Sequence, residues 1–270
     1  MNRIKTAFLE LGYIDILSGK DTPVHRIDPR AKLLTTIIFI ITVISFNKYE
    51  ISALIPFFIY PAVMIGLGEL PFYYLFRKLL IVTPFAIMIG IFNPLIDREI
   101  LMHLGTLPIS GGWISFTSIM LRFTLTAGSV LVLIACTGFN SVCMALEKMG
   151  TPRIFAVQLL FLYRYIFVLI DEASRMTNAR SLRSFDGKGK EIKVFSYLIG
   201  HLLLRTVDRA QRIYLAMLCR GFDGEIRVNR RLEAGNREVI FTIAWSAFFI
   251  AMRFYNLPLI AGRFITERIL

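Results

Sequence analysis

The chain has 270 residues, of which 56% are hydrophobic, and its formal net charge is +12. A soluble domain seldom reaches this apolar fraction, so the composition favours a membrane protein over an ordinary soluble enzyme. The three cysteines, Cys136, Cys143 and Cys219, have no paired spacing and predict neither a disulfide framework nor a cysteine-based metal site.

The first 139 residues predict a polar entry segment followed by membrane helices. Residues 1–32 are polar and do not have the form of a signal peptide. Asp28 followed by Pro29 predicts a helix start, because Asp suits the N-cap and Pro the first helical position. We predict five membrane-spanning helices in the whole chain, at residues 31–46, 51–67, 79–96, 113–139 and 239–252. A basic link at 68–78 and a loop at 97–112 lie between these segments.

The segment 140–236 separates the fourth predicted span from the last. It contains a short amphipathic helix and an apolar stretch, 155–170, that Arg164 interrupts. We interpret this stretch as an amphipathic helix lying at or across the membrane interface, and the stretch 194–204 has the same ambiguity. The predicted domains are therefore 1–139 with the first four spans, 140–236 with long amphipathic helices, and 237–270 with the last span and a tail.

Basic residues give the orientation of the chain. Sixteen Lys and Arg residues fall within 140–236, and the N-terminal segment is also basic. The links that would lie on the other side of the membrane carry few basic residues. The positive-inside rule therefore places the N-terminus and residues 140–236 in the cytoplasm, in a multi-pass protein of the inner (cytoplasmic) membrane.

A short phrase occurs twice in this cytoplasmic segment. The sequence SLRSFDG at 181–187 returns as LCRGFDG at 218–224, so that Arg183 and Arg220 are 37 residues apart. Each copy closes a helical pattern with glycine. We therefore predict two long helices whose C-terminal ends each carry an arginine beside a small residue, Ser184 or Gly221.

The second helix has two distinct faces. At about 100° per residue, its arginines share one face and its apolar residues the opposite face. The basic face holds Arg205, Arg209, Arg212 and Arg220, and the apolar face holds Leu204, Val207, Tyr214, Leu215 and Leu218. Such a helix lies on a membrane, another helix or a partner's groove. Helix-end arginines in a positive-inside loop are the simpler interpretation, but the repeated Phe-Asp-Gly favours a protein partner.

Several kinds of chemistry have no support in the sequence. There is no phosphate-binding loop of the Walker type, so we expect no ATP site. The three histidines, His25, His103 and His201, are far apart, so no metal or cofactor site is predicted. The basic patches flank membrane segments, which explains them without nucleic acid. Arg122 lies within the fourth span, either snorkelling to the interface or facing a water path.

Three stretches resemble one known family. Residues 22–34 read TPVHRIDPRAKLL, and the region from Pro152 through Arg164 and Glu172 continues to ARSLRSF at 179–185. The third stretch reads AMLCRGF at 216–222. Together they resemble the transmembrane T component of energy-coupling factor (ECF) transporters, the CbiQ/EcfT family, with the cobalt-type CbiQ proteins nearest. Ser184 stands where many members have Gly, so the first motif aligns on either Arg180 or Arg183.

The resemblance implies a function and partners. It implies a non-catalytic scaffold that couples ATP hydrolysis by two separate ABC-type ATPases (CbiO- or EcfA-like) to movement of a substrate-binding S component. The S component would be CbiM-like, with a small CbiN-like subunit, and the substrate cobalt or nickel. Membrane lipid is the remaining partner. The residues that the resemblance implies for ATPase coupling are Arg180, Ser181, Arg183, Ser184, Cys219, Arg220 and Gly221.

Two other classes of protein remain open on the sequence. One is a membrane channel or enzyme in which Arg122 and the basic helices line a path for an anionic substrate. The other is a structural protein that lays its basic face on anionic lipid. Co-purification of two ATPase subunits would separate a T component from both.

Overall fold

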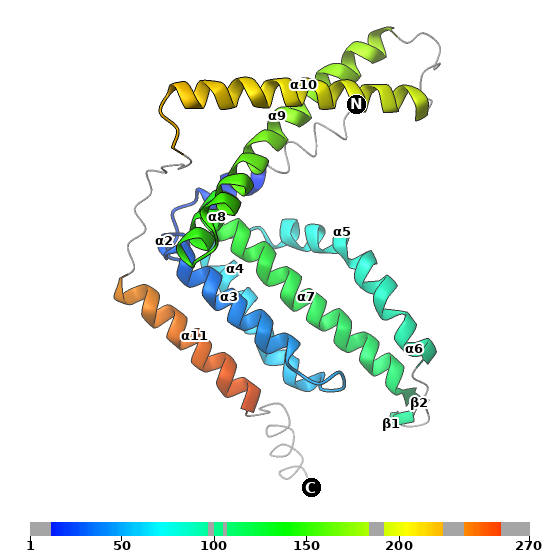
Figure 1. Cartoon of the computed structure of the whole chain (residues 1–270). Coiled ribbons are helices and arrows are strands. Elements are labelled where there is room, and N and C mark those ends of the chain that lie inside the picture. The colour runs from blue at the N-terminus through cyan, green and yellow to red at the C-terminus, as the bar shows by residue number, and fades with distance from the viewer. Residues whose placement is uncertain (1–11, 97–99, 105–106, 184–191, 224–234, 255–270) are drawn as a thin grey trace. The chain divides into compact units, whose positions relative to one another are not determined.

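A computed structural model describes residues 12–96, 100–104, 107–183, 192–223 and 235–254, and its elements are shown in Figure 1. Helices make up nearly all of the regular structure, which confirms the predicted all-α membrane fold. Two short strands, β1 (Ile100–Leu104) and β2 (Leu107–Ser110), form an antiparallel hairpin. The hairpin lies within residues 97–112, the segment predicted as a loop. Turn residues in that segment allow two extended pieces to pair.

The chain divides into two compact units. The core unit contains Leu17–Gly138 and Leu232–Leu270, and the crossed-helix unit contains Met1–Ile16 and Phe139–Arg231. The chain thus passes between the units after residues 16, 138 and 231.

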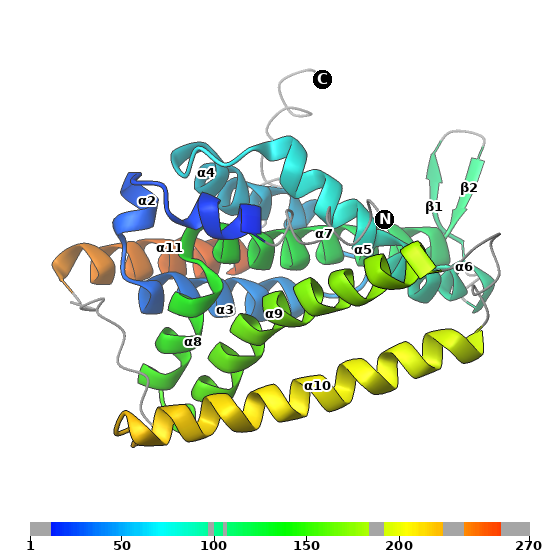
Figure 2. The same cartoon turned by 90° about the horizontal axis from the view of Figure 1, so that it is seen from above.

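Helices α3 (Pro29–Ile44), α7 (Gly111–Thr137) and α11 (Asn236–Phe254) of the core unit lie side by side in both views (Figures 1 and 2). Helix α3 packs against both α7 and α11, and α5 (Phe72–Gly90) also packs against α7. The helices of this unit are α2 (Pro23–Arg26), α3 (Pro29–Ile44), the 3₁₀-helix η1 (Ser52–Phe58), α4 (Ile59–Leu67), α5 (Phe72–Gly90), α6 (Phe92–Ile96), α7 (Gly111–Thr137) and α11 (Asn236–Phe254).

Two predicted helix starts have different outcomes. Helix α3 begins at Pro29, and the Asp28 side chain accepts a hydrogen bond from the Arg30 backbone N–H, which confirms the predicted cap. The prediction that residues 68–78 form a link was wrong, because α5 begins at Phe72. Phe72 stacks on Phe76 four residues later, one helical turn away, so the aromatic residues continue the helix instead of preceding it.

Aromatic side chains fill the centre of the core unit. Phe39 from α3 contacts Tyr60 from α4 and Phe249 from α11, at ring centroid distances of 4.9 and 5.2 Å. The Tyr60 hydroxyl lies 3.0 Å from the Thr36 hydroxyl, so its polar end is satisfied within the core. This cluster joins α3, the first long helix of the unit, to α4 and to α11, its last helix.

Three described helices are long and apolar enough to cross a membrane, judged by length and composition: Phe72–Pro94, Gly111–Thr137 and Arg153–Arg183. The apolar stretch Ser52–Leu67 is shorter. Large side chains on α5 remain uncovered, with Phe85 and Ile89 each 66% exposed. An apolar surface of this kind is expected where a helix contacts lipid.

Basic side chains bind the carboxyl ends of several core helices. Lys20 Nζ donates to the Glu69 carbonyl oxygen beyond α4 at 2.7 Å, and Lys32 Nζ donates to the Cys136 carbonyl oxygen in α7 at 3.1 Å. Arg253 donates to the Ser45 carbonyl oxygen after α3 at 3.0 Å. The last carbonyls of a helix have no partner within it, so these cations satisfy groups that lipid cannot.

The crossed-helix unit is built from α8 (Phe139–Lys148), α9 (Arg153–Arg183) and α10 (Ile192–Cys219). Helix α8 packs against α9, and α10 crosses α9 (Figure 1). The stretch 155–170, interpreted as an amphipathic helix at or across the interface, forms the first half of the continuous helix α9.

Candidate functional site

The two predicted arginine motifs lie at helix ends, as the repeat indicates. Helix α9 ends at Arg183 and α10 ends at Cys219, immediately before Arg220. Ser184 lies outside the described residues. Both Arg183 and Arg220 are exposed, and so is the free thiol of Cys219.

Gly221 gives the second motif its geometry. Its φ of +78° lies in the left-handed region, which glycine occupies without strain. The Phe222 N–H donates to the Met217 carbonyl oxygen and the Gly221 N–H donates to that of Leu218, both at 3.0 Å. These two bonds define a Schellman motif, which ends the helix at Cys219 and leaves Arg220 as its C-cap residue.

Phe222 anchors this helix end to α9. Its ring lies 6.2 Å from the ring of Phe161, measured between centroids. Gly221 therefore turns the chain, and Phe222 packs the turn against α9. The Arg220 side chain stays exposed to solvent. The sequence indicated the repeated Phe but not its partner Phe161, because the contact joins residues far apart in the chain.

The first motif is exposed over most of its length. Leu182 is 83% exposed, and the Ser181 hydroxyl donates to the Asn178 carbonyl oxygen at 2.8 Å within the last turn of α9. Arg180 is half-buried, and its Nη2 has no hydrogen-bond partner among the described residues. Because that atom is itself buried, the exposed surface of the motif consists of Ser181, Leu182 and Arg183.

An ion pair fixes the crossing of the two long helices. Arg205 Nη1 lies 2.6 Å from Glu172 Oε1 of α9. Arg209 and Arg212 line a hollow of about 280 Å³ at the same crossing. The prediction that these arginines share one face is consistent with this lining, but Arg205 serves the contact between α9 and α10. Glu172 was not identified as its partner from the sequence.

The apolar face of α10 is left uncovered by the residues that the structure describes. Its members are 45–64% exposed: Leu204, Val207, Tyr214, Leu215 and Leu218. An uncovered apolar face beside two exposed arginines has the composition of a docking surface.

Arg122 has a structural contact in the described part of the chain. Its Nη2 donates to the Asn47 carbonyl oxygen in the connection between α3 and η1. This hydrogen bond stabilises the connection between α3 and η1. It favours a structural role for Arg122 over a role in an anion path. The described residues also contain no group of three or more His, Cys, Asp or Glu side chains placed to hold a metal ion.

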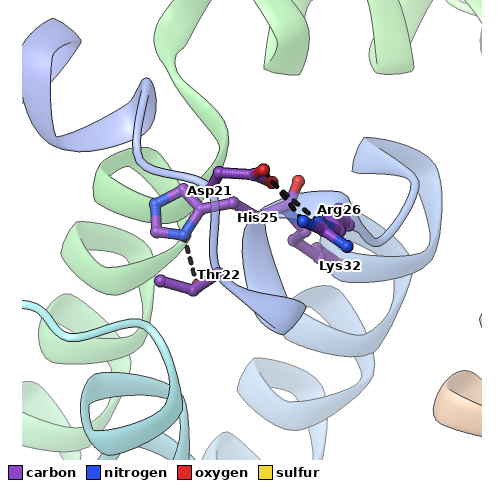
Figure 3. A network of polar contacts seen from close by, with 5 residues as sticks. All are labelled: Asp21, Thr22, His25, Arg26 and Lys32. Atoms are coloured by element: carbon purple, nitrogen blue, oxygen red, sulfur yellow. Dashed lines mark hydrogen bonds and ion pairs between the residues drawn. The ribbon is translucent and has the colours of Figure 1, made fainter.

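His25 belongs to a buried polar network, shown with its neighbours in Figure 3. Its Nε2 lies 3.0 Å from the Leu17 carbonyl oxygen, which can only accept, so Nε2 carries a proton. Its Nδ1 lies 2.7 Å from the Thr22 hydroxyl, which donates to it in the neutral ring. Burial, followed by the nearby Lys32 charge, lowers the pKa of His25 below its usual value of 6.5.

This depressed pKa predicts a pH dependence of stability. In the unfolded chain His25 gains a proton as the pH falls through 6.5, whereas in the folded chain it resists protonation until a lower pH. The stabilisation is therefore complete above pH 6.5 and is lost as the pH falls from 6.5 towards the folded pKa. Thermal unfolding in detergent should show this loss, and His25→Gln should reduce its slope. An unchanged slope in the variant would contradict the assignment.

The chain thus combines an apolar helical unit, as expected of a membrane protein, with two crossed helices whose ends carry exposed arginines. The profile of the CbiQ family, described as cobalt transport protein, matches residues 20–230. The chain belongs to this family, and it is a non-catalytic transmembrane component of a transporter of the energy-coupling factor type.

Individual relatives agree with this assignment. The energy-coupling factor transporter transmembrane protein EcfT of Bacillus subtilis is 27% identical over 228 residues, covering 77% of this chain and 85% of its own. EcfT of Heliobacterium modesticaldum is 28% identical over 249 residues, covering 85% and 92%. A protein of Methanocorpusculum labreanum that carries the name fused cobalt transport protein CbiMQ is 35% identical over 97 residues, covering 36% of this chain and 16% of its own.

Proposed function

We propose that this chain is the T component that couples two ABC-type ATPases to a substrate-binding S component, for the uptake of cobalt or nickel. The observation that carries the proposal is the pair of long crossed helices, each ending at an exposed arginine. An arginine offers a planar fork of donors that suits carboxylates and carbonyls in a protein groove. Two such ends match two ATPase subunits.

The residues proposed to contact the ATPases are those of the two motifs. In the first motif they are Arg180, Ser181, Arg183 and Ser184, and in the second Cys219, Arg220 and Gly221. Gly221 acts through the backbone, because its left-handed turn ends the helix directly after Arg220.

The S component is proposed to be CbiM-like. This rests on the name of the Methanocorpusculum relative, which joins M and Q parts in one chain. The family description favours cobalt as the transported ion. Cobalt here is cargo, and the chain is proposed to move the S component, which holds it.

The direct test is co-purification. When the tagged chain is expressed with its ATPases and S component and isolated from membranes, it should retain two ATPase subunits. It should also support ATP-dependent uptake of Co²⁺ in proteoliposomes. A chain that retains no ATPase would overturn the proposal and favour a structural protein on lipid.

Orientation is a separate part of the proposal. We place the N-terminus and residues 140–236 on the cytoplasmic side of the inner membrane, with the apolar first half of α9 embedded in the cytoplasmic leaflet. The sixteen basic residues of 140–236 support this placement.

Cys219 provides a native probe of this orientation. Its thiol is exposed, whereas Cys136 and Cys143 are buried. In cells that express the chain without its ATPases, a membrane-impermeant maleimide should therefore fail to label intact spheroplasts but should label inverted vesicles, and Cys219→Ser should remove that signal. Labelling of Cys219 in intact spheroplasts would reverse the proposed orientation.

A further inference from the structure

The core unit contains a buried lysine next to the places where the chain leaves it. The chain enters the core unit at Leu17 and leaves it after Gly138. Lys32, on α3, has no exposed surface, and its Nζ donates to the Cys136 carbonyl oxygen at 3.1 Å. This carbonyl lies in the last turn of α7, two residues before the chain leaves the unit.

The same lysine is connected to the entry point through His25. Lys32 Nζ also donates to the His25 carbonyl oxygen at 3.4 Å, and the His25 ring donates to the Leu17 carbonyl oxygen at 3.0 Å. All these residues are at least 96% buried: Leu17, His25, Lys32 and Cys136. A continuous chain of polar contacts therefore links the entry point of the core unit to its exit.

The entry and exit points also touch directly. A Cβ atom added to Gly138 would lie 2.8 Å from the Ser18 hydroxyl oxygen, so the backbone of Gly138 packs closely against Ser18. Gly138 has φ of +77°, which ends α7 and turns the chain towards Phe139. Two segments more than a hundred residues apart in sequence thus meet in one compact joint.

Burying a lysine is costly, and an apolar side chain of similar length would fill the same space at lower cost. An apolar side chain would not donate hydrogen bonds to the two helix-end carbonyl oxygens, those of His25 and Cys136. The cation also faces the negative ends of the helix dipoles of α2 and α7, which favours its charged form. The lysine therefore contributes rigid positioning in addition to packing.

We propose that Lys32, with His25, is the positioning joint through which movement of the crossed helices is passed to the membrane helices. This inference rests on the proposed function. The covalent connections at residues 16–17 and 138–139 are two of the three covalent connections between the units. A loose joint would let the crossed helices move while the membrane helices stay in place. Lys32 thus acts on coupling and has no part in ATPase docking.

Lys32→Met tests this joint, because it keeps an unbranched side chain and removes the cation. In the complex of this chain with its ATPases and S component, ATPase association and ATP hydrolysis should persist. The amount of Co²⁺ taken up per ATP hydrolysed should fall about tenfold, within the usual range of a coupling interaction. A purely structural role would lower uptake and ATP hydrolysis together and leave their ratio unchanged.

Lys20→Met is the matched control. Lys20 is also a lysine that donates to a helix-end carbonyl, that of Glu69, at 2.7 Å, but this contact is exposed and its ammonium group bonds neither His25 nor Cys136. The control should keep the normal ratio of Co²⁺ uptake to ATP hydrolysis.

Each outcome decides the inference. A normal ratio in Lys32→Met, or an equal loss in Lys20→Met, overturns it. If Lys32→Met does not accumulate in the membrane, Lys32→Gln, which keeps one donor group, is measured in the same assay. Failure of this variant to accumulate would make the network a folding element only and would overturn the proposal. If the wild-type chain retains no ATPase, the proposed function fails, and the joint fails with it.

Discussion

Alanine at both Arg183 and Arg220 should abolish association of the ATPases with the chain while leaving its membrane insertion intact. Each arginine ends a long helix and is exposed in the isolated chain. Removing one hydrogen-bonded charge from a docked interface costs roughly 2–5 kcal/mol. Because about 1.4 kcal/mol is a factor of ten in affinity, each single variant should weaken its site by more than tenfold. Co-purification and Co²⁺ uptake measure the effect.

Two further variants sharpen this test. Arginine-to-lysine changes at the same positions should restore little, because lysine lacks the planar fork. Arg175→Ala is the matched control, since Arg175 is an exposed arginine on α9 that pairs with Asp171 at 2.8 Å outside both motifs. Normal ATPase binding by the double variant would exclude the helix ends as the docking elements.

Gly221→Ala should weaken docking at the second motif without removing any side chain that contacts a partner. A left-handed conformation costs a residue with a Cβ atom roughly 1–2 kcal/mol. The helix would escape this strain by opening the turn, which displaces Arg220 and separates Phe222 from Phe161. The expected loss of ATPase affinity is about fivefold to thirtyfold at 1.4 kcal/mol per factor of ten.

Gly200→Ala provides the control for this change. Gly200 lies in the same helix, and a Cβ atom at either glycine would meet nothing within 4 Å. Only Gly221 of the two has a positive φ. The substitution at Gly200 should therefore leave docking unchanged, and an equal effect at both sites would show that the loss does not come from the turn.

Local signals explain the parts of the fold that could be predicted from sequence. Asp28 and Pro29 begin α3, and glycine after Arg220 ends α10, because caps depend on residues close in the chain. The start of α5 was misplaced since interfacial aromatics are compatible with both a link and a first helical turn. Hydropathy alone does not separate these possibilities.

The sequence predicted the two arginines of the candidate site but not the residues of α9 that contact α10. The repeated phrase identified Arg183 and Arg220, whereas Phe161 and Glu172 contact α10 across long separations in sequence. Lys32 was counted only among the basic residues that orient the chain. Its burial against α7 follows from tertiary packing, which a charge count does not contain.

The connection after α3 has a consequence for biosynthesis. Its Ser45 carbonyl oxygen is satisfied by Arg253, which lies 208 residues later at the end of α11. At about 5–20 residues per second, the ribosome needs on the order of 10–40 s to make the intervening chain. During that interval the carboxyl end of the first long helix has to be held by water, lipid headgroups or the insertion machinery. The core unit therefore closes only when its last helix arrives, and a chain truncated before Arg253 would expose that end to quality-control proteases.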